Sequence, residues 1–203
     1  MLFRSTIKTG VASVSDPLLY LKAPAVGGCG RNNYVVSSGT VTLSPGVYCG
    51  GLTIKGSANV TLSAGTYILN GGGMNVSGSA HVTGTGVTLY NTRDSTHPYG
   101  PITSQDTPVI TLSAPTSGSL AGILIFQDRS VVSATPNIIV GTLTGALYFP
   151  TTPIVLSSQQ NVATPYSIIV AKTLSLNVNT LTVSSNYSSL SEGSPIKVVT
   201  LTE

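Results

Sequence analysis

The sequence predicts an all-β fold, specifically a right-handed parallel β-helix in which short strands and turns wind into a single-stranded solenoid. Residues 40–48, TVTLSPGVY, return nineteen positions later as NVTLSAGTY, and residues 51–60, GLTIKGSANV, return twenty-two positions later as GMNVSGSAHV. Such offsets indicate coils of about 20 residues, a period typical of solenoids. Apolar and polar residues alternate within each recurrence, as in strands with one buried face. Right-handedness is expected because parallel β crossovers are almost always right-handed.

One domain is expected over residues 1–203, because a chain of this length can form a single continuous β-rich core. Residues 1–30 are predicted to form an N-terminal cap or linker, and residues 186–203 a C-terminal cap. Residues 91–108, NTRDSTHPYGPITSQDTP, break the alternation and are predicted to be a loop insertion. Strands are expected to resume at 109–112, 122–126, 143–149, 168–170, 174–176 and 181–183, with a closing strand at 195–201.

The composition excludes several classes of protein. Charged residues make up 7% of the chain, against the ~25% usual in soluble domains, so the surface is expected to be rich in hydroxyl groups. The nine basic residues are scattered and there is no Trp for base stacking, so no nucleic acid partner is expected. No apolar run approaches the ~20 residues that cross a bilayer, so no membrane span is expected within this chain.

Cys29 and Cys49 are expected to form a disulfide. They lie twenty residues apart, about one coil, so their Cα atoms would be separated by roughly one inter-strand step of ~4.8 Å, within disulfide range. An even cysteine count without a metal-ligand cluster favours a bond formed in an oxidising compartment, and two buried thiols are the alternative. The expected location is extracytoplasmic: periplasm, cell surface or secreted.

Catalysis would need clustered carboxylates, because lyases and hydrolases of β-helical fold use them for calcium binding or acid–base chemistry. The chain has six acidic residues, and only Asp106 and Asp128, twenty-two positions apart, could stack, with Arg129 and His97 nearby. A turn-capping Asp and a solvated Arg are the alternative reading. No His has a second His or Cys at ligand spacing, so no metal site and no cofactor are expected. The enzyme hypothesis, a polysaccharide lyase or hydrolase, is therefore secondary.

Recognition is expected on two variable features, because loops on rigid scaffolds commonly carry binding. These are the 91–108 loop and the corner at 127–129. The candidate binding residues are Arg93, Asp94, His97, Tyr99, Asp106, Gln127, Asp128 and Arg129.

Thr-x-Thr pairs suggest a further alternative, an ice-binding solenoid, because stacked threonines on a flat face can order water. The pairs are Thr40/Thr42, Thr83/Thr85, Thr142/Thr144 and Thr180/Thr182. Thr is also a good strand residue whose hydroxyl faces solvent, which leaves a purely structural reading open.

Five strings resemble the C-terminal β-helical region of Tad-type Flp pilus-assembly proteins, the TadG-like group of bacterial envelope proteins. They are TLSPGVYCGG (42–51), GGGMNVSG (71–78), GTGVTL (84–89), AGILIFQDRS (121–130) and LTGALYFP (143–150). The resemblance implies a non-catalytic structural or adhesive module outside the cytoplasmic membrane, connected with pilus assembly or surface attachment. Its partners would be envelope or pilus proteins, or surface glycans. Because members carry an N-terminal membrane helix, the chain is expected to be part of a longer membrane-anchored protein.

Overall fold

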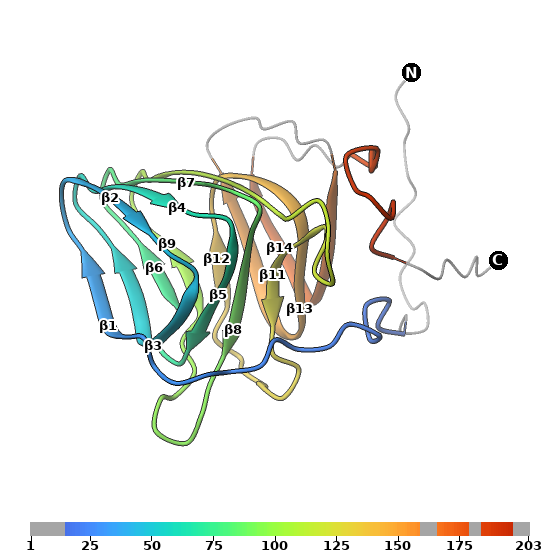
Figure 1. Cartoon of the computed structure of the whole chain (residues 1–203), viewed down its shortest axis with the longest axis horizontal. Helices are drawn as coiled ribbons and strands as arrows, with labels where there is room; N and C mark the ends of the chain where they lie inside the picture. Colours follow the sequence, from blue (N-terminus) through green and yellow to red (C-terminus); the bar gives the residue numbers. More distant parts are fainter. Residues whose placement is uncertain (1–14, 159–165, 179–183, 197–203) are drawn as a thin grey trace.

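The computed structural model describes residues 15–158, 166–178 and 184–196, where all regular secondary structure is β-strand (Figure 1). The predicted strand at 181–183 and most of the predicted closing strand lie outside these ranges. The strands are β1 (Arg31–Val36), β2 (Thr40–Leu43), β3 (Gly46–Ile54), β4 (Asn59–Leu62), β5 (Gly65–Asn70), β6 (Met74–Val76), β7 (His81–Thr85), β8 (Val87–Thr92), β9 (Ile102–Ser104), β10 (Val109–Ser113), β11 (Ile123–Gln127), β12 (Asn137–Ile139), β13 (Thr142–Ser158) and β14 (Ser167–Val178).

Strands one recurrence apart pair in parallel, as the sequence predicts. Thr40 of β2 lies opposite Asn59 of β4, and Asn59 lies opposite His81 of β7, so both predicted offsets are the actual registers. Val60, Leu62, Val76 and Val82 are all buried in one shared core. The prediction of parallel stacking around a common core is therefore confirmed.

The predicted open, single-stranded, right-handed β-helix is nevertheless wrong. Eight strands form a closed circuit of parallel pairs, in the order β3, β5, β8, β11, β13, β12, β9, β6 and back to β3. The sheet is thus a closed parallel β-barrel rather than an open solenoid. A further row, β2, β4, β7 and β10, joins this circuit at β13.

Two long strands close the circuit. β3 pairs with β5 through its first half and with β6 through its second. β13 pairs successively with β10, β11 and β12. The backbone of β3 and β13 passes through Gly50–Gly51 and Gly145 without ending the strand.

Both faces of part of the barrel wall are buried. In β5, Tyr67 and Leu69 contact the inner core, whereas Ile68 points to the opposite face and packs in a second apolar cluster. Leu18 and Leu21 of the N-terminal segment belong to this outer cluster. The segment before β1 therefore covers the outside of the wall.

Buried tyrosines connect the inner core to the turns that precede β3 and β5. The rings of Tyr48 and Tyr67 stack at 5.8 Å between centroids. The Tyr48 hydroxyl donates to the Ser44 carbonyl at 2.8 Å, and the Tyr67 hydroxyl donates to the carbonyls of Leu43 and Ser63 at 2.7 and 2.9 Å. Each phenol thus satisfies its polar end while burying its ring.

These phenols should make the fold sensitive to alkali. Burial raises the pKa of Tyr67 from 10.0 to about 12, and burial also raises the pKa of Tyr48 and Tyr148. Because the folded state holds these protons more tightly than the unfolded state, their stabilisation is complete below pH 10 and is lost as the pH rises through 12. Denaturant titrations should show the free energy of unfolding falling across this window. A smaller fall is expected in Tyr67→Phe, and a flat profile in the parent chain would contradict the assignment.

Candidate functional site

The loop between β8 and β9 carries four of the predicted binding residues. β8 runs to Thr92 and β9 lies within the predicted insertion, so the irregular connection is residues 93–101. Arg93 and Asp94 are exposed, while His97 and Tyr99 are partly buried. Among them, the Tyr99 hydroxyl is directed inward, at 3.3 Å from Oδ1 of Asn137.

Asp94 gives this loop a defined shape. Its Oδ1 accepts hydrogen bonds from the backbone N–H groups of Thr96 and His97 at 2.8 and 2.7 Å, which is an Asx turn. Its Oδ2 accepts the side-chain amide of Asn70 at 2.7 Å, which anchors the turn to β5. Nδ1 of His97 lies 3.0 Å from both carboxylate oxygens.

The hydrogen bonds from His97, Thr96 and Asn70 hold the pKa of Asp94 well below its usual range. Asp94 is therefore a carboxylate at neutral pH. A carboxylate on one ring nitrogen orients the imidazole and leaves the other nitrogen free for a further partner. The loop thus presents an oriented His97 ring and also carries the exposed Arg93.

The predicted disulfide is confirmed: Cys29 and Cys49 are bonded, with Cα atoms 5.7 Å apart. Their predicted one-repeat equivalence is not observed, because β1 pairs with β3 so that Asn32, not Cys29, lies opposite Cys49. The bond attaches the segment before β1 to β3. Such a bond is consistent with an oxidising location outside the cytoplasm.

The structure brings the disulfide next to the loop, which the sequence analysis missed. A ring nitrogen of His97 and the sulfur atoms of Cys29 and Cys49 lie within 4.8 Å of one another. In the oxidised chain both sulfurs share a bond and are not thiolate ligands. Reduction would give two thiols beside an oriented imidazole, and zinc favours such sulfur and nitrogen ligands once the thiols lose their protons. Sequence spacing could not show this cluster, since His97 is far from both cysteines along the chain.

The 127–129 corner is built from buried and partnered groups. Gln127 is fully buried and exchanges hydrogen bonds with Asn91, whose amide donates to Oε1 of Gln127 at 3.2 Å. Asp128 accepts the Thr92 hydroxyl at 2.5 Å and the Ser130 backbone N–H at 2.8 Å. Burial raises the pKa of Asp128, but the hydrogen bonds from Thr92 and Ser130 outweigh it and lower the pKa overall.

The partly buried Arg129 binds the N-terminal segment. Its guanidinium donates to the carbonyls of Leu18 and Leu21 at 2.7 and 3.1 Å and to the Tyr148 hydroxyl at 2.5 Å. The carboxylate of Asp16 lies 3.5 Å away and also accepts the Tyr148 hydroxyl. The reading of Arg129 as a solvated residue is therefore wrong.

Asp106 occupies a separate turn. It has a positive φ of 65° and accepts the backbone N–H of Gly78 at 2.8 Å, after β9. Asp106 follows β9, which pairs with β6, whereas Asp128 follows β11, which pairs with β8. The two carboxylates therefore follow strands that do not pair with each other. The possible stacking of Asp106 with Asp128 does not occur, because the actual registers bring Gly78 to Asp106 and Thr92 to Asp128.

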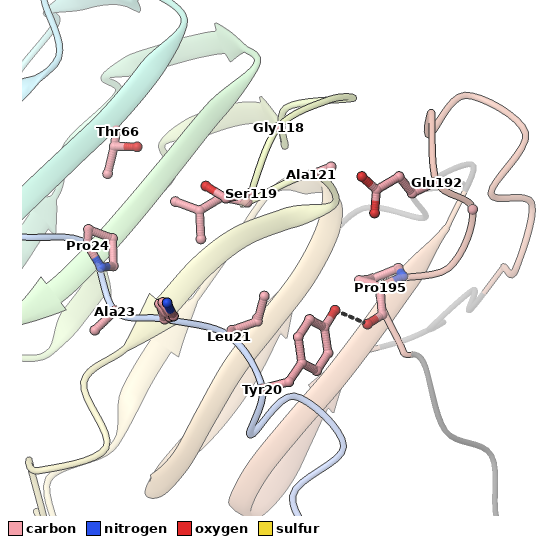
Figure 2. Close-up of a pocket in the computed structure, with 13 residues that line it drawn as sticks. Tyr20, Leu21, Ala23, Pro24, Thr66, Gly118, Ser119, Ala121, Glu192 and Pro195 are labelled. Atoms are coloured by element: carbon pink, nitrogen blue, oxygen red, sulfur yellow. Dashed lines mark hydrogen bonds between the residues drawn. The ribbon is translucent and has the colours of Figure 1, made fainter.

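A pocket of about 780 Å³ lies between the N-terminal segment, the loop before β11 and the segment around Glu192 (Figure 2). The Tyr20 hydroxyl donates to the Pro195 carbonyl at 2.5 Å and joins two of these walls. The lining of the pocket combines apolar groups of Leu21 and Leu120 with polar groups of Lys22 and Ser119. No local pattern in the sequence predicts this pocket, because segments near opposite ends of the chain form two of its walls.

Comparisons were made with protein-family models, with curated proteins and with solved structures, and none of the three found a match for this chain. The TadG-like resemblance therefore stays a hypothesis. In the described ranges, no helix has the length and apolar character needed to cross a membrane.

Proposed function

We propose that this chain is a non-catalytic structural or adhesive module outside the cytoplasm, connected with pilus assembly or surface attachment and belonging to a longer membrane-anchored protein. The proposal rests on the structural role of four carboxylates. Asp16, Asp94, Asp106 and Asp128 each accept hydrogen bonds that shape a turn or attach a segment. These acidic groups thus stabilise a rigid scaffold, and they are distributed over separate turns.

The recognition surface in this proposal is the loop 93–101. Arg93 is exposed, and the His97 ring is oriented by Asp94. The loop is attached to β5 through Asn70 and lies against the disulfide, so binding would cost little ordering of the backbone. A surface glycan or an envelope protein with hydrogen-bonding groups fits this mixture of a cation, an imidazole and hydroxyls.

Glycan binding and turnover can be measured in one assay. The purified chain is incubated with immobilised acidic and neutral polysaccharides of bacterial envelopes, with and without calcium, and with isolated envelopes. Binding without release of products is expected. Arg93→Ala should weaken binding about tenfold, the effect of removing one interfacial contact worth about 1.4 kcal/mol, whereas Lys172→Ala, on exposed strand β14, should not.

The rival enzyme hypothesis predicts a different result. Asp128→Asn removes the charge, keeps one acceptor oxygen for the Ser130 N–H and places an amide N–H that can donate to the Thr92 hydroxyl. Turnover by the parent chain that disappears in a folded Asp128→Asn variant would overturn the non-catalytic proposal. Failure to bind any of the glycans or the envelopes would overturn its adhesive part.

A further inference from the structure

The row of strands outside the closed circuit carries a line of threonines in register. Thr42, Thr61, Thr83, Thr111 and Thr142 lie opposite one another on β2, β4, β7, β10 and β13. The first four are exposed and the last is partly exposed. Neighbouring parallel strands lie about 4.8 Å apart, so the backbone positions that carry these threonines repeat at this spacing. The hydroxyl oxygens of Thr61 and Thr83 are 3.5 Å apart.

A second line of hydroxyls runs beside the first, two residues further along each strand. Thr85, Ser113 and Thr144 lie opposite one another in the paired registers. Ser44 and Ser63 directly follow the paired residues Leu43 and Leu62, and all five are exposed or partly exposed. Two residues of a strand span about 6.6 Å, which sets the distance between the lines. The ten residues together form the hydroxyl array.

Buried leucines and tyrosine hydrogen bonds fix the backbone that carries the array. Leu43, Leu62 and Leu112 lie between the two lines and point into the core, where each is buried. The Tyr48 and Tyr67 hydroxyls hold the carbonyls of Ser44 and Ser63 at 2.8 and 2.9 Å. The spacing of the array is therefore set before any ligand arrives, which lowers the ordering cost of binding.

The chemistry of the array indicates a neutral, periodic ligand. Each hydroxyl can both donate and accept, and none of the ten side chains is charged. An anionic polymer would find no cation among them. The flanking exposed line, Thr40, Asn59, His81 and Val109, adds a single ionisable group.

We propose that the hydroxyl array binds ice. On the prism faces of hexagonal ice, oxygen atoms repeat in two directions at distances similar to those of the array, and each can donate and accept hydrogen bonds. Threonine also presents a methyl group, so the array can order water through both its hydroxyls and its apolar groups. This proposal goes beyond the proposed function and uses other residues, since the 93–101 loop lies on the side of the molecule away from β2, β4 and β7 (Figure 1).

A crystalline neutral polysaccharide is the nearest competing ligand. Its sugar rings would gain most from aromatic side chains on which their C–H faces can pack. The array and its flanking line contain no aromatic side chain other than the His81 imidazole. The composition of the face therefore favours ice.

Nanolitre osmometry with the whole chain tests the proposal by measuring thermal hysteresis and the shape of single ice crystals. The parent chain should facet crystals and show hysteresis. Thr83→Tyr, in the centre of the array, should abolish both. Thr173→Tyr makes the same substitution on exposed strand β14, outside the array, and should leave both unchanged. Circular dichroism and thermal unfolding verify that each variant is folded.

Should Thr83→Tyr fail to fold, Thr61→Lys serves instead, because Thr61 is exposed and a hydrated ammonium would prevent contact with the lattice. Round, unfaceted crystals with the folded parent chain would overturn the proposal. So would equal hysteresis in the parent and the array variant, or partition of the parent onto crystalline cellulose or chitin rather than into growing ice. Loss of glycan binding by the loop leaves these readings unaffected, so the two proposals fail separately.

Discussion

Gly72→Ala is expected to abolish folding or to lower the free energy of unfolding by about 4 kcal/mol or more, through backbone strain and steric overlap together. Gly72 has a φ of +69°, which residues with a Cβ adopt reluctantly. A Cβ there would lie 2.2 Å from the carbonyl oxygen of Gly50 and 2.6 Å from the nitrogen of Gly51. Both contacts are with backbone, so no side-chain rotation can relieve them.

The same glycine contacts position the candidate recognition loop. A Cβ on Gly100 would lie 2.3 Å from the carbonyl carbon of Gly72, so the far end of the loop packs directly on this glycine. The Gly72 N–H also donates to the Pro98 carbonyl at 2.8 Å. Any Gly72→Ala chain that does fold should therefore bind glycans more weakly than the parent, because the loop must move.

Gly39→Ala is the matched control. Gly39 has a similar φ of +76°, but a Cβ there would meet nothing within 4 Å. Gly39→Ala therefore measures the backbone strain alone, about 1–2 kcal/mol, without the steric overlap that a Cβ on Gly72 would add. Guanidinium unfolding, followed by tyrosine fluorescence and circular dichroism, gives the free energy of unfolding of each variant. Equal losses in the two variants would show that close packing at Gly72 is not decisive.

Arg129→Ala is expected to lower the free energy of unfolding by about 3 kcal/mol and to release the N-terminal segment from the barrel wall. The guanidinium bridges the carbonyls of Leu18 and Leu21 and bonds the Tyr148 hydroxyl. Its removal would leave polar groups without partners beside an apolar cluster. Arg129→Lys should lose less but should not restore the parent value, because an ammonium cannot match the planar fork of donors.

Two measurements separate this role from a general loss of positive charge. Hydrogen exchange and limited proteolysis should show earlier opening around residues 15–24 in Arg129→Ala. Arg129 lies 5.1 Å from the ring centroid of Phe126. Arg31→Ala is the control, because the Arg31 guanidinium likewise lies over a ring, 5.1 Å from the centroid of Tyr48, and its loss should cost about 1 kcal/mol. Unchanged exchange of the N-terminal segment in Arg129→Ala would contradict the assigned role.

The sequence predicts only part of the hydroxyl array. The Thr-x-Thr pairs at 83/85 and 142/144 belong to it, but the pairs on the other strands are Thr-x-Ser, at 42/44, 61/63 and 111/113. Thr40, which the sequence analysis paired with Thr42, lies in the flanking line. Thr180 and Thr182 lie outside the described residues. Only the registers show that these serines and threonines lie on one surface.

The sequence by itself determined the local features: the β-strands, the parallel registers at offsets of nineteen and twenty-two residues, and the disulfide between Cys29 and Cys49. These follow from alternation, recurrence and spacing, which are properties of neighbouring or repeating residues. A recurrence indicates which residues face one another, but it does not say whether the row of strands stays open or closes.

The tertiary structure alone decided the closure of the barrel, the bonding of Arg129 to the N-terminal segment and the proximity of His97 to the disulfide. Closure depends on β3 and β13 each pairing with more than one strand. The hydrogen bond of Arg129 to Leu18 and the proximity of His97 to Cys29 involve residues remote in the chain and outside any repeat. Such contacts are selected by the packing of the whole wall, so no local pattern in the sequence encodes them.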